Sequence, residues 1–378
     1  MSGTSLDGLD AVAVRWSPTG SGLSCLSRAR RDFDAALRRE LLELNAPGHD
    51  ELHKAALAAN RISTLAAEAV TELLAGAGLT TSSVRAIGLH GQTIRHRPTE
   101  FDGVGYSLQI HNASLLAELS GIDVVCDFRS RDVAGGGQGA PLVPAFHAGV
   151  FHQPGRDVAV LNLGGIANLT LLQADGRVAG FDCGPANVLM DHWIQECLGR
   201  AFDESGAWAA SGRVDPELLR AFQADDFFRM RGPKSTGRDR FNRPWLESVA
   251  GDRLHQAASQ DVQATLCELT AWAAHEHLRR ELPQARILWV CGGGAFNAHL
   301  MGRLRSLMEE RLPGPLTVAP SSDAGMDPMD VEPTAFAWLA RRFLLREPGN
   351  LAAVTGAKGP RILGALYPAG PGSAPRDA

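Results

Sequence analysis

Cysteine is scarce in this sequence of 378 residues, and its placement argues against two classes of protein. The cysteines lie far apart and form no C-x-x-C pair, at positions 25, 126, 183, 197, 267 and 291. Such isolated cysteines do not suit a disulfide framework or a zinc cluster, and they fit a reducing compartment. We therefore expect a cytoplasmic protein without a zinc site.

Long apolar runs and an excess of positive charge are also missing. No eighteen consecutive residues are apolar, so no membrane span is predicted. The first residues contain neither the basic nor the apolar region of a secretory signal. The net charge of −5 argues against broad binding to a nucleic-acid backbone. Lysine occurs only at positions 54, 234 and 358, a bias to which we attach no functional meaning.

The composition is that of an ordinary globular protein. It is 44% hydrophobic and 21% charged, which is enough apolar material for a sizeable core. At roughly 100–200 residues per domain, the length suggests two domains. Apolar runs typical of strands alternate with helical patterns, which predicts α/β domains with mixed sheets. The expected strands are 11–16, 84–89, 122–126, 158–163, 166–172, 178–181 and 287–291, and the expected helices are 50–79, 187–198, 261–280, one from about 297, and 331–345.

The first motif is Ser2-Gly-Thr-Ser-Leu-Asp-Gly8, a turn that precedes a strand. Its backbone amides and hydroxyl groups could cradle phosphate oxygens. Asp7 could hold Mg²⁺, directly or through water, because this cation prefers oxygen ligands. The alternative is a plain β-turn with solvated polar residues, and the segment taken alone favours that alternative.

Two further glycine-rich turns follow strands. In 162–168, Gly164 and Gly165 join two apolar runs as a hairpin, and they allow a ligand to approach the backbone closely. In 291–297, three glycines could let a flat group such as adenine lie against the backbone, although the pattern is neither G-x-G-x-x-G nor a P-loop. Each segment alone is equally compatible with an ordinary turn. Two glycine hairpins at the same relative place in two halves favour a clamp on a polyphosphate.

Single polar residues offer the remaining chemistry. Asp182 follows a strand and precedes a Gly-Pro turn, where a carboxylate can act as a general base or simply cap the turn. Arg129 and Arg131 could clamp a carboxylate, or they could belong to a surface ion-pair cluster. Gln92 and Thr93 could bond sugar hydroxyl groups, or they could close a turn.

Taken in order, the motifs resemble those of the anhydro-N-acetylmuramic acid kinases over nearly the whole chain. The matching stretches are MSGTSLDGLDAV (1–12), GLHGQT (88–93), DFRSRDVAGGGQGAPLVPAFH (127–147), NLGGIANLT (162–170), FDCGPANVLMD (181–191), PKSTGR (233–238), CGGGAFN (291–297) and VTGA (354–357). That family belongs to the sugar kinase, Hsp70 and actin-like superfamily. The resemblance therefore implies two ribonuclease H-like α/β domains with mixed sheets flanking an interdomain cleft that binds ATP. The domains would span 1–134 with about 350–367, and 135–349, followed by a disordered tail at 368–378.

The resemblance also implies a reaction. Enzymes of this family use ATP and Mg²⁺ to open the ring of 1,6-anhydro-N-acetylmuramic acid with water and to phosphorylate O6. The product, N-acetylmuramic acid 6-phosphate, serves the recycling of the bacterial cell wall. Members are typically homodimers, and their partners are the sugar and ATP, with no nucleic acid or membrane involved.

Residue by residue, the resemblance assigns Asp182 as the base and places Glu332 near the active site. Gln92, Thr93, Arg129 and Arg131 remain the candidates for binding the sugar, and Asp7 is the candidate for Mg²⁺. The ATP-binding residues would come from the two hairpins and from the glycines near the nucleoside: Gly3, Thr4, Ser5, Leu6, Asp7, Gly8, Leu9, Asp10, Asn162, Gly164, Gly165, Asn168, Gly292, Gly293, Gly294 and Asn297.

The sequence departs from the family pattern at its start and in its loops. The family usually has several apolar residues before the first Ser-Gly-Thr, so either the true start lies upstream of Met1 or the first strand is short and weakly paired. His111, Cys183 and Ala186 stand where Gly, Thr and Gly are expected, which affects loop shape more than chemistry.

Three other functions remain open from the sequence, and one of them is a catalytically inactive regulator. A kinase for another 1,6-anhydrosugar would have no lactyl carboxylate to recognise, so paired assays with both sugars would separate the two readings. An actin- or Hsp70-like ATPase that acts as a binding module would need a partner surface or a peptide domain. Such a protein would hydrolyse ATP without depending on a sugar.

Overall fold

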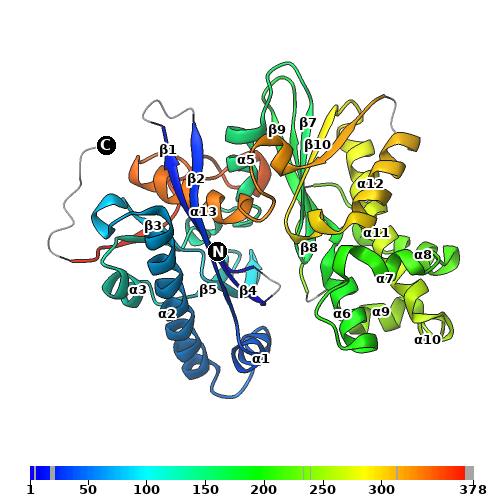
Figure 1. Cartoon of the computed structure of the whole chain (residues 1–378), viewed down its shortest axis with the longest axis horizontal. Coiled ribbons are helices and arrows are strands. Elements are labelled where there is room, and N and C mark those ends of the chain that lie inside the picture. Colours follow the sequence, from blue (N-terminus) through cyan, green and yellow to red (C-terminus); the bar gives the residue numbers. More distant parts are fainter. Residues whose placement is uncertain (4–5, 18–21, 233, 239, 312–313, 371–378) are drawn as a thin grey trace. The chain divides into compact units, whose positions relative to one another are not determined.

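Two compact units make up the chain in the computed structural model: unit 1 comprises residues 1–146 and 329–378, and unit 2 comprises residues 147–328 (Figure 1). The structure describes residues 1–3, 6–17, 22–232, 234–238, 240–311 and 314–370. Thr4 and Ser5, and most of the predicted tail, lie outside the described residues. In the described part of the chain, no helix combines the length and apolar character needed to cross a membrane.

Unit 1 holds several small sheets and surrounding helices. Its strands are β1 (Gly8–Trp16), β2 (Leu23–Asp32), β3 (Ile87–Gly88), β4 (Gln92–Pro98), β5 (Gly105–Ile110), β6 (Val124–Cys126) and β12 (Ala365–Tyr367). Its helices are α1 (Ala35–Glu43), α2 (Glu51–Ala77), α3 (Ala113–Ser120), α4 (Ser130–Ala134), α13 (Val331–Leu344) and α14 (Ala352–Thr355). Strands β1 and β2 pair antiparallel, as do β4 and β5. The sheet β12-β6-β3 is mixed, because β6 is parallel to β3 and antiparallel to β12. A cavity of about 780 Å³, lined mainly by apolar side chains, lies between β1, β3, α2 and α13.

The longest helix of unit 1, α2, follows directly from its sequence. Alanine and leucine, which favour helices, recur on one face, where Ala58, Ile62, Ala69 and Leu73 are buried. The helix ends at Gly78, which adopts the left-handed conformation (φ 62°) that glycine tolerates best. The helix predicted at 50–79 is therefore confirmed.

Helix α13 packs with unit 1. The ring of Phe336 lies 4.5 Å from that of His90 and 5.7 Å from that of Phe128, measured between ring centroids. A Cβ atom at Gly88 would lie only 2.2 Å from the Phe336 carbonyl oxygen, so β3 needs glycine there. The compact units therefore differ from the expected ranges: residues 135–146 and 329–349 lie with unit 1, whereas the sequence placed them with the second domain.

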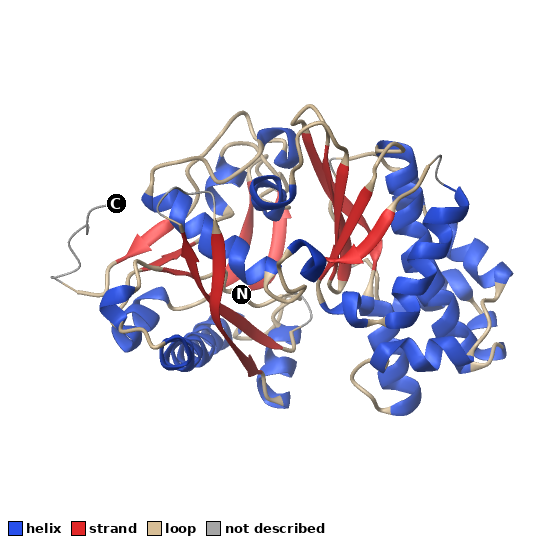
Figure 2. Ribbon diagram, turned by 45° about the horizontal axis from the view of Figure 1, so that its top comes forward, coloured by secondary structure: helices blue, strands red, loops and turns tan. Residues whose placement is uncertain are grey.

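Unit 2 is built on one mixed five-stranded sheet with the order β11-β10-β7-β8-β9. Its strands are β7 (Val158–Leu163), β8 (Ile166–Leu172), β9 (Val178–Pro185), β10 (Ile287–Cys291) and β11 (Thr317–Pro320). Its helices are α6 (Asn187–Leu198), α7 (Ala207–Ser211), α8 (Pro216–Gln223), α9 (Arg243–Ala250), α10 (Arg253–Gln256), α11 (Ser259–Glu281) and α12 (Ala298–Arg311). Helix α5 (Val143–Phe151) spans the boundary between the units. β10 runs parallel to β7 and β11, while β7, β8 and β9 are antiparallel neighbours. Figure 2 shows the helices of unit 2 gathered beside this sheet. The predicted α/β fold with mixed sheets is confirmed.

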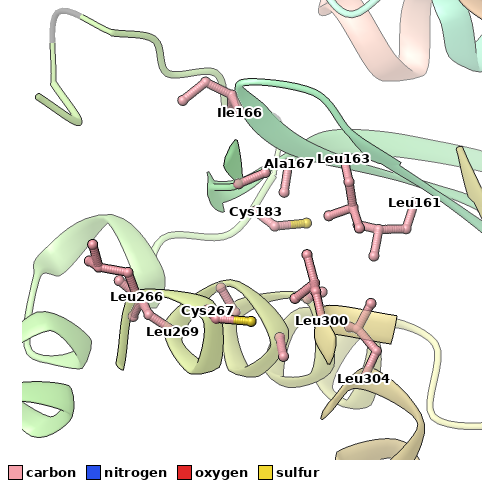
Figure 3. Packing of buried hydrophobic residues seen from close by; sticks show 14 of the residues in the cluster. Leu161, Leu163, Ile166, Ala167, Cys183, Leu266, Cys267, Leu269, Leu300 and Leu304 are labelled. Carbon is pink, nitrogen blue, oxygen red and sulfur yellow. The ribbon is translucent and has the colours of Figure 1, made fainter. Parts of the chain in front are cut away.

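The core of unit 2 lies between this sheet and the helices α11 and α12. Figure 3 shows Leu161, Leu163 and Cys183 pointing toward Cys267 of α11 and Leu300 of α12. Because side chains along a strand alternate between the two faces of a sheet, the residues between these positions face the other way. The opposite face therefore carries the polar side chains described next.

Candidate functional site

Three polar residues form a row across the sheet of unit 2. Asn162 of β7 pairs with Asn168 of β8, and Asn168 pairs with Asp182 of β9. Directly opposed residues in antiparallel strands point to the same face, with Cβ atoms roughly 4.5–5.5 Å apart. The sequence predicted these residues one by one. The register brings them together at the end of the sheet where the glycine hairpin turns.

The loop that follows η3 (Asp226–Arg229) holds Asp182 in place. The backbone amide of Asp182 donates to the carbonyl oxygen of Lys234 (3.1 Å), and the amide of Thr236 donates to Asp182 Oδ2 (2.8 Å). The Thr236 hydroxyl oxygen is buried and has no hydrogen-bond partner among the described residues. The carboxylate is therefore oriented, and a hydroxyl group beside it is available to a ligand or a water molecule.

The turn between β7 and β8 is fixed from behind by the start of α6. Gly164 accepts hydrogen bonds from the Asn187 amide (3.0 Å) and from Asn187 Nδ2 (2.9 Å). Gly165 accepts from the amide of Ala186 (3.0 Å). The carbonyl groups of the turn are thus occupied, and its backbone amides are the groups that could meet an anion.

The glycines after β10 serve two different purposes. A Cβ atom at Gly292 would lie 2.4 Å from Asn162 Oδ1, and one at Gly294 would lie 2.5 Å from Leu163 Cβ. These two glycines are therefore required for close packing of the strand ends. Gly293 has open space around its would-be Cβ atom, which suits the approach of a ligand. Asn297 Oδ1 accepts from the amide of Leu300 (2.9 Å), so this side chain caps α12.

In unit 1, the turn before β1 is closed and braced. The Asp10 amide donates to the Met1 carbonyl oxygen (2.9 Å), and Ser2 Oγ donates to the Gly8 carbonyl oxygen (3.0 Å). Gln92 is fully buried, and its side-chain Nε2 donates to the Gly3 carbonyl oxygen (3.1 Å). This geometry favours Gln92 as a support behind the turn over contact with a sugar.

Other predicted residues of this turn are split between the core and the surface. The side chains of Leu6 and Leu9 are buried in the hydrophobic core of unit 1, so only their backbone could meet a phosphate. The carboxylates of Asp7 and Asp10 are bridged by Arg30, at 2.9 and 3.1 Å. Burial raises the pKa of Asp10. Among the described residues, no group of three or more acidic, histidine or cysteine side chains is arranged to hold a metal ion.

Arg129 and Arg131 have different surroundings. Arg129 Nη1 donates to the Gly139 carbonyl oxygen (2.7 Å), and its Nη2 lies 3.0 Å from His90 Nε2. His90 Nδ1 in turn lies 3.1 Å from the Ser2 carbonyl oxygen. Arg129 thus links two loops of unit 1, whereas the Arg131 side chain is exposed.

Thr93 is half-buried, and its Oγ1 accepts a hydrogen bond from Gln109 Nε2 (3.1 Å). Glu332 lies in the first turn of α13. Burial raises the pKa of Glu332, and the nearby Asp10 carboxylate acts in the same direction, while Arg129 opposes them. Its protonated form is therefore favoured relative to a solvated glutamate.

The chain matches one protein family along nearly its whole length. The family model described as anhydro-N-acetylmuramic acid kinase matches residues 1–369. The chain belongs to the anhydro-N-acetylmuramic acid kinase family. The resemblance seen in the motifs is thereby confirmed.

Relatives that carry this family's name match along their full length. The anhydro-N-acetylmuramic acid kinase of Variovorax paradoxus is 55% identical over 374 residues, which is 98% of this chain and 98% of that protein. The one of Pseudomonas paraeruginosa is 53% identical over 371 residues, again 98% of both. Among solved structures, an activator of 2-hydroxyisocaproyl-CoA dehydratase from Clostridium difficile with bound ADPNP matches with a TM-score of 0.41 and 8% sequence identity. The match covers 85% of this chain and 91% of that chain. This similarity is too low to bear on function.

Sequence reasoning missed Thr236 as a member of the site. The PKSTGR stretch is among those that match the family, but its residue types do not indicate that the Thr236 backbone amide contacts Asp182. Ser, Thr and Lys in a loop are compatible with many roles, and the contact with Asp182 joins residues 54 positions apart. Only the folded register of β9 reveals it.

The raised pKa of Glu332 leads to a prediction for stability. Because the folded-state pKa lies above the unfolded value of 4.5, the unfolded chain binds fewer protons than the folded chain between the two values. Stability therefore falls as pH rises through this window. We expect Glu332→Gln to be more resistant to urea than the parent at pH 7 and indistinguishable from it at pH 4. If Glu332→Gln resists urea no better than the parent at pH 7, ionisation of Glu332 does not destabilise the folded state.

Proposed function

We propose that this chain is an ATP-dependent kinase that opens the ring of 1,6-anhydro-N-acetylmuramic acid with water and phosphorylates O6. The observation that carries the proposal is the Asp182 carboxylate, oriented by the Thr236 amide at the end of the Asn162–Asn168 row. A carboxylate oriented by a backbone amide suits the activation of one water molecule. Membership of the family supports the choice of substrate.

In the proposed reaction, Asp182 takes a proton from water as the water oxygen attacks C1 of the sugar. The C1–O6 bond breaks, and O6 then attacks the γ-phosphorus of ATP. ADP leaves, and the product is N-acetylmuramic acid 6-phosphate. A positioned base contributes about 10²–10⁴-fold in rate, and the phosphoryl step depends mostly on alignment and charge neutralisation.

The residues around the two turns suit the remaining tasks. The amides of Gly164 and Gly165, with the braced turn from Gly3 to Asp10, would hold phosphate oxygens. Asp7 and Asp10 supply carboxylate oxygens of the kind Mg²⁺ prefers, and Arg30, which now bridges them, would have to release one. When bound, Mg²⁺ would neutralise charge on the transferred phosphoryl group. We further propose a homodimer and a cytoplasmic location.

The proposal is tested by incubating the chain with ATP and each of two sugars. We expect phosphate transfer to 1,6-anhydro-N-acetylmuramic acid, with ³¹P NMR placing the phosphate on O6. Faster transfer to 1,6-anhydroglucose would favour a kinase for another anhydrosugar. ATP hydrolysis at the same rate with and without sugar would favour an ATPase acting as a binding module.

The exposed Arg131 gives a specific prediction about the lactyl group. A guanidinium can pair with the lactyl carboxylate through two parallel hydrogen bonds, which are worth about 1.5–3 kcal/mol when charged groups are involved. We expect Arg131→Ala to raise KM for the muramic sugar about tenfold. Its KM for 1,6-anhydro-N-acetylglucosamine, which lacks the lactyl group, should not change. An equal rise for both sugars would contradict a role in recognising the carboxylate.

A further inference from the structure

One of the chain's few lysines, Lys234, is buried in the core of unit 2. Its Nζ donates to the Phe227 carbonyl oxygen (2.7 Å) and lies 2.8 Å from His277 Nε2. The ammonium group also sits 4.0 Å from the centroid of the Phe227 ring, a cation–π distance. The ammonium group therefore has three partners.

The direction of the bond between Lys234 and His277 follows from the other ring nitrogen. His277 Nδ1 lies 2.7 Å from the Ala273 carbonyl oxygen, which can only accept, so Nδ1 carries a proton. Burial, aided by the charge of Lys234, lowers the pKa of His277 to about 4, so the ring is neutral at pH 7. Its Nε2 is then an acceptor, and Lys234 is the donor. Burial lowers the pKa of Lys234 to about 8, which leaves it mostly charged at pH 7.

The segment that carries Lys234 lies along β9. A Cβ atom at Gly232 would lie 2.8 Å from Phe181 Cδ1, so the loop approaches the strand closely there. Two residues later, the Lys234 carbonyl oxygen accepts from the Asp182 amide. Two residues after that, the Thr236 amide reaches Asp182 Oδ2. The segment thus runs beside β9, with Lys234 pointing into the core and Thr236 meeting the carboxylate.

We propose that Lys234 is a positioning residue for the reaction: its hydrogen bonds to Phe227 and His277 fix the loop so that the Thr236 amide orients the Asp182 carboxylate. The inference rests on the proposed function, because it gives Asp182 its role. An apolar side chain would fill the same space without the cost of burying an ammonium group, which amounts to several kcal/mol. A charged anchor with directional partners, by contrast, specifies one register of the loop. A slip of that register would misplace the base, and a misplacement of about 1 Å can cost about 10²-fold in rate.

The test compares two variants of the full-length chain. Lys234→Met keeps the aliphatic stem and removes the ammonium group. We expect its kcat for phosphorylation of 1,6-anhydro-N-acetylmuramic acid to fall about tenfold to a hundredfold, while KM for ATP stays within about twofold. The Thr236 amide should exchange with solvent at least about tenfold faster, as expected when a local hydrogen bond is lost.

Arg280→Met is the matched control. Arg280 lies on α11, the helix that carries His277, and donates to the carbonyl oxygens of Phe228 (3.3 Å) and Met230 (3.0 Å), next to Phe227, which Lys234 contacts. Among the described residues it forms no hydrogen bond with Lys234, Ser235 or Thr236, so kcat and exchange of the Thr236 amide should be those of the parent. His277→Leu removes one acceptor of Lys234 and should change both readouts in the same direction as Lys234→Met, by less.

Two results would overturn the inference. One is a Lys234→Met variant with parental kcat and parental exchange at Thr236. The other is equal acceleration of amide exchange throughout unit 2, which would make Lys234 a general stabiliser of the fold. Because exchange of the Thr236 amide is measured without substrate, it tests the role of Lys234 even if the parent chain does not phosphorylate the sugar. Failure of the parent chain to phosphorylate the sugar would refute the proposed function alone.

Discussion

Asp182→Asn is expected to retain ATP binding and to lower turnover at least a hundredfold. The amide side chain has nearly the same shape as the carboxylate, and its oxygen can still accept from the Thr236 amide at the position of Oδ2. It cannot take a proton from water, so the contribution of the base, about 10²–10⁴-fold, is lost. Titration calorimetry measures ATP binding, and a coupled assay for ADP measures turnover.

Asp175→Asn is the matched control for this substitution. Asp175 lies in the turn between β8 and β9 and pairs with the exposed Arg177 (2.7 Å). The same chemical change at this place should leave both measurements unaltered. Near-normal turnover in Asp182→Asn would exclude Asp182 as the base. Loss of ATP binding would assign the carboxylate to the nucleotide site instead.

The second large effect is expected on stability, at Asp132 of α4. This fully buried carboxylate accepts from the Gly139 amide (2.8 Å), Asn350 Nδ2 (2.6 Å) and Thr355 Oγ1 (2.8 Å). It thereby ties the glycine-rich loop to the segment around α14. A Cβ atom at Gly137 would lie 2.2 Å from Asp132 Oδ2, so the loop is also pressed against the carboxylate.

Asp132→Ala should lower the free energy of unfolding by about 3–5 kcal/mol, because three buried donors lose a charged acceptor. Urea unfolding followed by circular dichroism measures the change. Asp132→Asn should lose less, since one oxygen remains for Asn350 and Thr355 while an NH₂ group faces the Gly139 amide. Asp102→Ala is the control: this exposed residue accepts from two amides of a turn and should cost less than about 1 kcal/mol. If Asp132→Ala lowers the free energy of unfolding no more than Asp102→Ala does, the hydrogen bonds to Asp132 contribute little to stability.

The sequence was sufficient for the elements whose apolar pattern is strong. The hairpin 158–172, the helices α2, α11 and α13, and the strand β10 all lie close to their expected ranges. Asn162, Asn168 and Asp182 stand out in the sequence because each is a polar residue inside or at the end of an apolar run. Their arrangement as one row could not be predicted. It depends on the register of three strands and on a bulge beside Asn168.

Elements with weak patterns escaped prediction. The strand β2, LSCLSRARRD, is rich in arginine and serine and exposes several of its positions, so it lacks the alternation that marks a strand. Its Arg30 nevertheless contacts Asp7 and Asp10, residues expected to serve the phosphate site. The strand predicted at 84–89 is shorter, at Ile87–Gly88. The sequence left open whether Gln92 contacts the sugar or closes a turn. Its burial depends on partners about ninety residues away along the chain.

The proposed reaction adds water at C1 of the sugar and places the phosphoryl group on O6. It is tested most directly by running the reaction in H₂¹⁸O and quenching it within the first turnovers. We predict a product with one solvent oxygen on C1 and none in the phosphate group, as measured by mass spectrometry and ³¹P NMR. Solvent oxygen in the phosphate group, or a phosphorylated product that still contains the anhydro ring, would contradict this reaction.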